Sequence, residues 1–176
     1  MQNTITDISS KKVSPLTLVY LKDNDKVLLI KRSSKKKMVA REWLGLGGKV
    51  EPGEELIASA RREFKEESGL NINDPLLRGT FTWVDETKWA GTLYVFIATD
   101  YDGDLLDRSD EGELKWHKIR DIDDLTGLAG HQKLFLKKLL LDDNYFYCGI
   151  AVYKNNNLVS YADNEQCFSE RQNIAR

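Results

Sequence analysis

The sequence has few cysteines and histidines, and neither residue type is spaced for a metal or redox site. Its 176 residues include two cysteines, Cys148 and Cys167, and two histidines, His117 and His131. The cysteines form no C-x-x-C pattern, so we expect both to be reduced thiols in a cytoplasmic protein. The histidines are separated in the sequence, and we expect both to be structural.

Long apolar runs and an excess of one charge are also absent. No run approaches the roughly 20 apolar residues of a membrane-spanning helix, and the first twelve residues, MQNTITDISSKK, are polar, unlike a signal peptide. Acidic and basic residues number 28 and 26, for a net charge of −2. Duplex nucleic-acid binders normally carry a basic excess. We therefore expect neither a membrane nor a nucleic-acid partner.

Strand and helix patterns alternate along the chain without repeats or low-complexity linkers. We therefore expect one domain, residues 13–162, between a flexible N-terminus, 1–12, and a C-terminal tail, 163–176. Both a monomer and a homodimer are compatible with this. β-branched and apolar runs predict strands at 13–21, 26–31, 80–84, 92–99 and 114–119 and a terminal hairpin of 145–153 with 158–161. Helical spacing predicts a helix at 54–68, with Ile57, Ala60 and Phe64 facing the core and Gly69 at its C-terminal end. It also predicts a helix at 132–141 whose apolar packing residues are Leu134, Leu136, Leu139, Leu140 and Leu141. Residues 33–41 and 85–88 are expected to be loops.

The most informative stretch runs from Gly48 to Leu70 and reads GKVEPGEELIASARREFKEESGL. Glu63, Glu66 and Glu67 follow a glycine-rich turn, and in a helix they share one face. Such like charges destabilise a helix by a few tenths of a kcal/mol per pair, roughly. Clustered carboxylate oxygens suit Mg²⁺ or Mn²⁺, which commonly accompany phosphate substrates. The alternative is an ordinary solvated acidic face.

The same stretch resembles the Nudix box, G-x5-E-x7-R-E-U-x-E-E-x-G-U, where U is apolar. The specified positions hold Gly48, Glu54, Arg62, Glu63, Phe64, Glu66, Glu67, Gly69 and Leu70. The flanking segments KVLLIKR, WLGLGGKVEPGE, SDEGELKW and FYCGIAVYKNNNLVSY resemble MutT-type members of the family. The resemblance implies an α+β fold, a Nudix α/β/α sandwich with a mixed sheet packed between helices.

The resemblance also implies a set of site residues. It assigns the metal, Mg²⁺ or possible Mn²⁺, to the carbonyl of Gly47 and to Glu63, Glu66, Glu67 and Glu111. It assigns catalysis to Glu66, Glu63, Arg62 and Glu111, with Arg62 holding a box glutamate in place. Helical spacing alone predicts that Arg62 pairs with Glu66 four residues later, as a surface ion pair. Arg32 and Lys49 are candidate phosphate contacts. Asp110 and Glu113 compete with Glu111 for its role.

The implied activity is hydrolysis of a nucleoside triphosphate to the monophosphate and pyrophosphate, with dGTP or 8-oxo-dGTP as substrate in nucleotide-pool sanitation. Leu44 and Leu128 stand where some members place polar or aromatic base-reading residues, so we expect burial and stacking to dominate purine binding. One alternative is a hydrolase of nucleoside diphosphate derivatives such as ADP-ribose. Another is a non-catalytic nucleotide-binding module.

Overall fold

The computed structural model describes residues 13–34, 40–85, 90–154, 157–164 and 167–169. Their elements are β1 (Val13–Asp23), β2 (Lys26–Arg32), β3 (Trp43–Leu44), α1 (Leu56–Ser68), β4 (Asn71–Ile72), β5 (Leu76–Asp85), β6 (Ala90–Ala98), β7 (Tyr101–Asp102), β8 (Arg108–Ser109), β9 (Gly112–Lys118), η2 (Ile119–Asp121), η3 (Gly130–Leu134), α2 (Leu136–Leu141), β10 (Tyr147–Lys154), β11 (Asn157–Asp163) and β12 (Cys167–Ser169). No helix in these ranges is long and apolar enough to cross a membrane.

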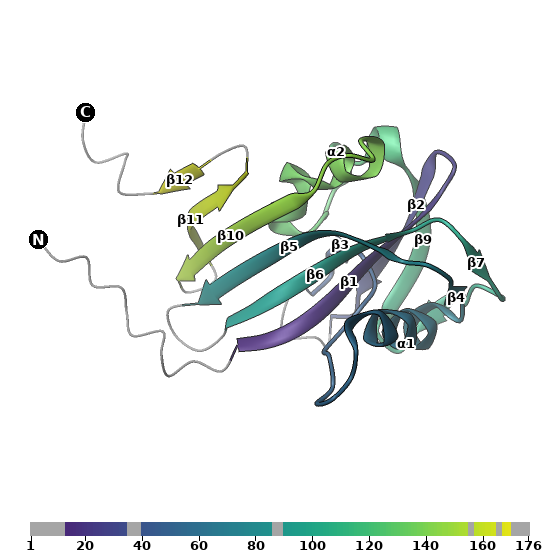
Figure 1. Cartoon of the computed structure of the whole chain (residues 1–176). Helices are drawn as coiled ribbons and strands as arrows, with labels where there is room; N and C mark the ends of the chain where they lie inside the picture. The colour runs from purple at the N-terminus through teal and green to yellow at the C-terminus, as the bar shows by residue number, and fades with distance from the viewer. Residues whose placement is uncertain (1–12, 35–39, 86–89, 155–156, 165–166, 170–176) are drawn as a thin grey trace, which may run out of the picture.

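Ten of the described strands form one mixed sheet, in the order β12-β11-β10-β5-β6-β1-β2-β9-β8, with β3 paired to β2 (Figure 1). The pairs β1–β6 and β10–β5 are parallel, and the other neighbours are antiparallel. The predicted mixed sheet is therefore confirmed. The short strands β4 and β7 form a separate antiparallel pair.

Helices α1 and α2 lie on opposite sides of this sheet (Figure 1). Successive side chains of β1 and β2 point to opposite faces. Val19 and Leu28 therefore join a hydrophobic cluster with Phe64 of α1. Leu18 and Leu29 join a second cluster that contains the buried leucines of α2, Leu136, Leu139 and Leu140. The two clusters make the α+β sandwich that the sequence predicted.

The acidic helix α1 begins two residues later than predicted. Glu55 is its N-cap, because the Glu55 carboxylate accepts hydrogen bonds from the amides of Ile57 and Ala58 at 3.0 and 2.9 Å. Gly69 ends the helix in the left-handed region, φ 80°, as predicted. Phe64 is buried, but Ile57 is 37% exposed, so its predicted place in the core is wrong.

The second predicted helix, 132–141, is interrupted. The 3-10 helix η3 ends at Leu134, and the non-helical φ of Phe135, −130°, separates it from α2. Phe135 is buried and stacks on Tyr147 of β10 at 3.9 Å between ring centroids. Leu134 and Leu141, predicted to be apolar packing residues, are 45% and 61% exposed. The tertiary contact of Phe135 thus overrides the leucine spacing.

The long strands match their predicted positions with shifted ends, whereas β3, β4, β7 and β8 have no counterpart among the predictions. The terminal hairpin is present as β10 and β11, and β12 pairs with β11 inside the segment predicted as a tail. Residues 1–12 and most of the predicted loops 33–41 and 85–88 lie outside the described residues.

Candidate active site

The glycine-rich segment before α1 lies against β1. The amides of Thr17 and Val19 donate to the carbonyls of Gly48 and Leu46 at 2.9 and 2.7 Å, and the Leu46 amide donates back to Val19 at 3.0 Å. These bonds hold residues 46–48 as a short extended stretch beside the sheet. The glycines are thereby placed next to the acidic face of α1.

Two of these positions require glycine. Gly47 has φ 148°, and a Cβ there would lie 2.2 Å from the Thr17 carbonyl oxygen. A Cβ on Gly48 would lie 2.3 Å from the carboxylate of Glu63. Any side chain at Gly48 would therefore displace Glu63, so the glycine permits close approach of backbone and carboxylate.

Glu67 is the buried carboxylate of the site. Its side chain accepts a hydrogen bond from the Gly47 amide at 2.8 Å, and the residue is only 8% exposed. Burial raises the pKa of Glu67 to about 8, with further increases from the charges of Glu111 and Glu63. The Gly47 amide and Arg32 oppose this rise. Two acids of α1 and a third from outside the box thus influence one another here.

Arg62 connects the other acids of the box. Its guanidinium pairs with both carboxylate oxygens of Glu54 at 2.8 and 2.9 Å and with Glu63 at 2.9 Å. It also reaches Glu66 at 3.4 Å and the carbonyl of Lys49 at 3.2 Å. Both contacts predicted for Arg62, to a box glutamate and to Glu66, are present. This guanidinium offsets the repulsion among the clustered acids.

Glu111, outside the box, is brought to the same place by the sheet. The Ser33 amide donates to the Glu111 carbonyl at 2.8 Å, and the Arg32 guanidinium lies 3.5 Å from the Glu111 carboxylate. Glu113 instead sits on β9, where it is exposed and influences His117. The structure therefore favours Glu111 over Glu113 as a neighbour of Glu67. Lys49 is exposed at the rim of the site.

The donor set suits a hard divalent cation. Glu63, Glu67 and Glu111 offer carboxylate oxygens, and the glycine-rich segment adds backbone carbonyls. Burial first, and then the charges of Glu111 and Glu63, raise the pKa of Glu67, and a bound cation would favour the charged form of this carboxylate. Within the described ranges, no three side chains of histidine, cysteine, aspartate or glutamate are gathered closely enough to hold an ion. Glu63 and Glu66 contact Arg62 instead.

The sequence did not signal the hydrogen bond that the Gly47 amide donates to the Glu67 carboxylate. The two residues are twenty positions apart, and only the packing of the glycine-rich segment beside α1 brings them together. The predicted base-reading position is also corrected. Leu128 is 4% exposed and bridges to Trp43 in the core, so it cannot face a base. Leu44 is partly buried against both hydrophobic clusters.

The remaining aromatic and histidine side chains are mainly structural. Trp43 is buried with the half-buried His117 ring 4.5 Å away, edge to face, and Trp116 packs beside Tyr101. The predicted structural role therefore agrees with the position of His117. Trp89 and the side chain of His131 lie outside the described residues.

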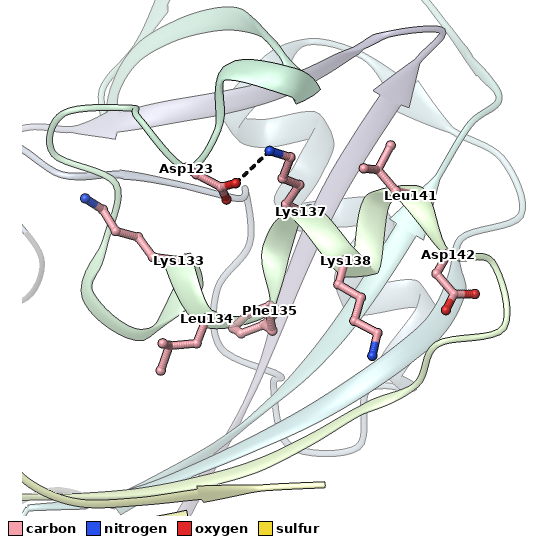
Figure 2. Close-up of a pocket in the computed structure, with 8 residues that line it drawn as sticks. All are labelled: Asp123, Lys133, Leu134, Phe135, Lys137, Lys138, Leu141 and Asp142. Atoms are coloured by element: carbon pink, nitrogen blue, oxygen red, sulfur yellow. Dashed lines mark hydrogen bonds and ion pairs between the residues drawn. The ribbon is translucent and has the colours of Figure 1, made fainter. Parts of the chain in front are cut away.

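A surface groove of about 430 Å³ over η3 and α2 is separate from these acids (Figure 2). Two of the lysine side chains that line this groove interact with neighbouring residues of the protein. Lys137 pairs with Asp123 at 2.6 Å, and Lys138 lies 4.3 Å from the centre of the Tyr145 ring. None of the acids or glycines described above lines this groove. The candidate catalytic and metal-binding residues therefore lie at α1 and not at this groove.

A mixed sheet between helices, with an arginine-braced acidic helix beside a glycine-rich segment, defines a class of hydrolases. The sequence matches the NUDIX domain over residues 13–139. The chain therefore belongs to the Nudix family and is a MutT-like Nudix hydrolase.

Three known proteins illustrate the similarity. An uncharacterized Nudix hydrolase of Bacillus subtilis, YvcI, is 35% identical over 119 residues, 65% of this chain and 72% of YvcI. The oxidized purine nucleoside triphosphate hydrolase of Danio rerio is 37% identical over 109 residues, 61% of this chain and 67% of that protein. The crystal structure of a mutator MutT protein from Bacillus halodurans superimposes with a TM-score of 0.76 at 30% identity, covering 88% of this chain and 99% of that one.

Proposed function

We propose that this protein is a Mg²⁺-dependent pyrophosphohydrolase that converts a purine nucleoside triphosphate to the monophosphate and pyrophosphate. The observation that carries this proposal is the buried Glu67, held by the Gly47 amide beside Glu63 and Glu111. The similarity to the Danio rerio enzyme, whose name describes oxidized purine triphosphates, supports the substrate class.

We assign the following roles to the residues of the proposed site. Glu63, Glu66, Glu67, Glu111 and the Gly47 carbonyl would hold the ion. A bound divalent ion supplies charge that polarises phosphate oxygens and lowers the pKa of an attacking water. Arg32 and Lys49 attract the phosphates, and one of the carboxylates Glu63, Glu66 and Glu111 accepts the proton from water. Arg62 keeps Glu63 and Glu66 in position.

The test is a panel of nucleotides assayed with Mg²⁺ and with EDTA. We expect release of pyrophosphate and monophosphate from triphosphates, only when the metal is present. Cleavage of ADP-ribose without triphosphate hydrolysis would instead establish the nucleoside diphosphate alternative. A folded protein that binds nucleotides and hydrolyses none would establish the non-catalytic module.

Glu67→Gln provides the matched variant because it removes an anionic donor and keeps the side-chain size. We expect kcat/KM at saturating Mg²⁺ to fall at least ~10-fold. Glu51→Gln is the control, since Glu51 is exposed and its side chain is no part of the proposed site. Equal activity in the two variants would rule out a role for Glu67.

A cytoplasmic location and a monomeric or homodimeric state stay predictions, as do the domain limits 13–162.

A further inference from the structure

The hydroxyl of Thr17 on β1 is buried and makes no hydrogen bond. Thr17 is only 1% exposed, and its Oγ1 atom has no partner among the described residues. A buried hydroxyl without a partner has given up its hydrogen bonds to water without compensation, which destabilises the folded protein. Valine would fill nearly the same space without this penalty. Packing alone therefore does not account for a threonine at this position.

The side chain of Thr17 points toward α1. Helix α1 packs against β1 (Figure 1). Val19, two residues further along β1, belongs to the hydrophobic cluster that contains Ala60 and Phe64 of α1. Side chains alternate between the two faces of a strand, so Thr17 shares a face with Val19. The hydroxyl therefore lies on the side of the sheet that the acidic helix covers.

Gly48 lies directly opposite Thr17 in the glycine-rich segment. The antiparallel bridge between Val19 and Leu46 sets this register, and the Thr17 amide donates to the Gly48 carbonyl at 2.9 Å. Directly opposed residues of an antiparallel pair project to the same face, with Cβ atoms about 4.5–5.5 Å apart. Because Gly48 has no side chain, the space beside Thr17 on this face is open to another group.

The carboxylate of Glu63 occupies the space beside Gly48. A Cβ on Gly48 would lie 2.3 Å from Glu63 Oε2 and 2.7 Å from Oε1. The Arg62 guanidinium donates to Oε1 at 2.9 Å, so Oε2 is the oxygen on the glycine side. The Thr17 hydroxyl and Glu63 Oε2 therefore border the same space between β1 and α1.

We propose that Thr17 is a positioning residue for Glu63, and that its hydroxyl donates a hydrogen bond to Glu63 Oε2 when this carboxylate holds the divalent ion. The inference rests on the proposed function, in which Glu63 is one of the metal ligands. Thr17 acts through Glu63 and is not itself a ligand. Rotation of the two side chains is enough to form the bond, because both border the same space.

Two donors then fix the Glu63 carboxylate from opposite sides. Arg62 holds Oε1 and Thr17 holds Oε2, so the carboxylate keeps one orientation beside the glycine-rich segment. A carboxylate oxygen has two acceptor sites, so Oε2 can bind a cation and accept the hydroxyl together. Removal of a hydrogen bond that orients a metal ligand typically lowers metal affinity or activity by roughly 10- to 100-fold.

Thr17→Val is the informative variant, because valine has nearly the shape of threonine and lacks the hydroxyl. We expect its melting temperature in EDTA to equal or exceed that of the wild type, since an unpaired buried hydroxyl is removed. The dissociation constant for Mn²⁺, measured on the nucleotide-free full chain by electron paramagnetic resonance, should rise ~10-fold. The increase in melting temperature that Mn²⁺ produces should become smaller accordingly.

Thr17→Ser and Thr80→Val are the matched controls. Serine keeps the hydroxyl, so Thr17→Ser should bind Mn²⁺ within ~3-fold of the wild type. Thr80 lies on β5, where its hydroxyl contacts the Cys148 sulfur at 3.6 Å, and it is no part of the acidic site. Thr80→Val should therefore retain the wild-type affinity.

A double-mutant cycle shows whether Thr17 acts through Glu63. Glu63→Asp keeps the charge, so that Mn²⁺ binding stays measurable, and withdraws the carboxylate from the hydroxyl by one methylene. Adding Thr17→Val to Glu63→Asp should weaken binding by less than ~2-fold further, because the hydrogen bond is already lost. An equal ~10-fold loss in both backgrounds would show that Thr17 acts on another group and would overturn the inference.

Two other results would also overturn it. One is an unchanged Mn²⁺ dissociation constant in Thr17→Val. The other is a lower melting temperature of Thr17→Val in EDTA, which would assign the hydroxyl a role in folding.

The two proposals can fail separately. Coupling of Thr17 to Glu63 in Mn²⁺ binding, in a protein that hydrolyses no triphosphate, would discard the enzymatic proposal and keep the positioning role. Mg²⁺-dependent hydrolysis of triphosphates, together with wild-type Mn²⁺ affinity in Thr17→Val, would do the reverse.

Discussion

At the scale of single residues, Arg62 explains how three glutamates share one helical face. A guanidinium has five N–H donors in a planar fork. The structure directs them to Glu54, Glu63, Glu66 and the Lys49 carbonyl. The hydrogen bonds from Arg62 to Glu54 and Glu63 raise the pKa of Arg62 above its usual value, and the bonds to Glu54 have the larger effect. Lysine could not reproduce this, since it lacks the planar fork.

Glu111 and Glu113 provide a prediction at this scale. We expect Glu111→Ala to lower kcat with little change in the melting temperature, because its carboxylate influences Glu67 and is partly exposed. Glu113→Ala should leave kcat unchanged, because Glu113 is an exposed residue of β9 near His117. Steady-state kinetics at saturating Mg²⁺ measures both. The opposite pattern would move the catalytic position two residues along the chain.

At the scale of elements, both ends of α1 are fixed by local chemistry. Glu55 caps the N-terminus, and Gly69 donates its amide to the Lys65 carbonyl at the C-terminus. Gly69 also lies under the 104–106 segment, where a Cβ would be 2.7 Å from the Asp104 carbonyl oxygen. The position therefore needs glycine for two reasons, backbone conformation and space.

Gly69→Ala should destabilise the protein more than Gly127→Ala. Both glycines have φ 80°, so each substitution introduces left-handed strain of ~1–2 kcal/mol. Only Gly69 is crowded by backbone, since the nearest atom to a Cβ on Gly127 is 3.7 Å away. Urea unfolding of both variants measures the difference. Equal decreases in the free energy of unfolding would show that the 104–106 segment moves aside without an energetic penalty.

Glu54 makes the loop before α1 sensitive to acid. Its hydrogen bonds to Arg62 and to the Glu51 amide lower the pKa of Glu54 from 4.5 to about 2. A carboxyl group whose pKa is lower in the folded state than in the unfolded state stabilises the folded protein at pH values above its unfolded-state pKa. This stabilisation is lost as the pH falls through the folded-state pKa. We expect the stability difference between wild type and Glu54→Gln to be present at pH 6 and to vanish between about 4.5 and 2. Denaturant titrations at several pH values test this, and a pH-independent difference would refute it.

At the scale of the whole molecule, the terminal hairpin is part of the core. Tyr147, Ala151 and Tyr161 are fully buried, and the two tyrosine hydroxyls lie 3.1 Å apart. Arg78 of β5 donates to the carbonyls of Asp142 and Tyr145 at 2.6 and 3.0 Å. The hairpin therefore completes the fold, although it lies beyond the family match.

A chain ending at residue 141 should accordingly fail to fold cooperatively. Loss of the terminal hairpin would expose Phe81 and Phe135, which stack on Tyr147. It would also leave β5 with an unpaired edge. Among the described elements, a chain ending at residue 164 loses β12 alone, so it should retain a cooperative transition. Circular dichroism melting curves of the two truncated chains provide the comparison. A cooperative transition in the shorter chain near the full-length melting temperature would contradict the expectation.

The sequence by itself determined the long strands, the acidic helix with its Gly69 end and the cluster of box glutamates. These features depend on periodicity, capping and local spacing, which a sequence displays directly. It misplaced Ile57, Leu134 and Leu141, because helical spacing does not say which apolar side chains find a partner.

Only the tertiary structure decided how distant groups meet. It brought Glu111 beside Arg32, directed the Gly47 amide to Glu67, and buried Leu128 in the core. Such contacts depend on sheet order and on the crossing of segments far apart in the chain, and no local pattern of residues encodes either one.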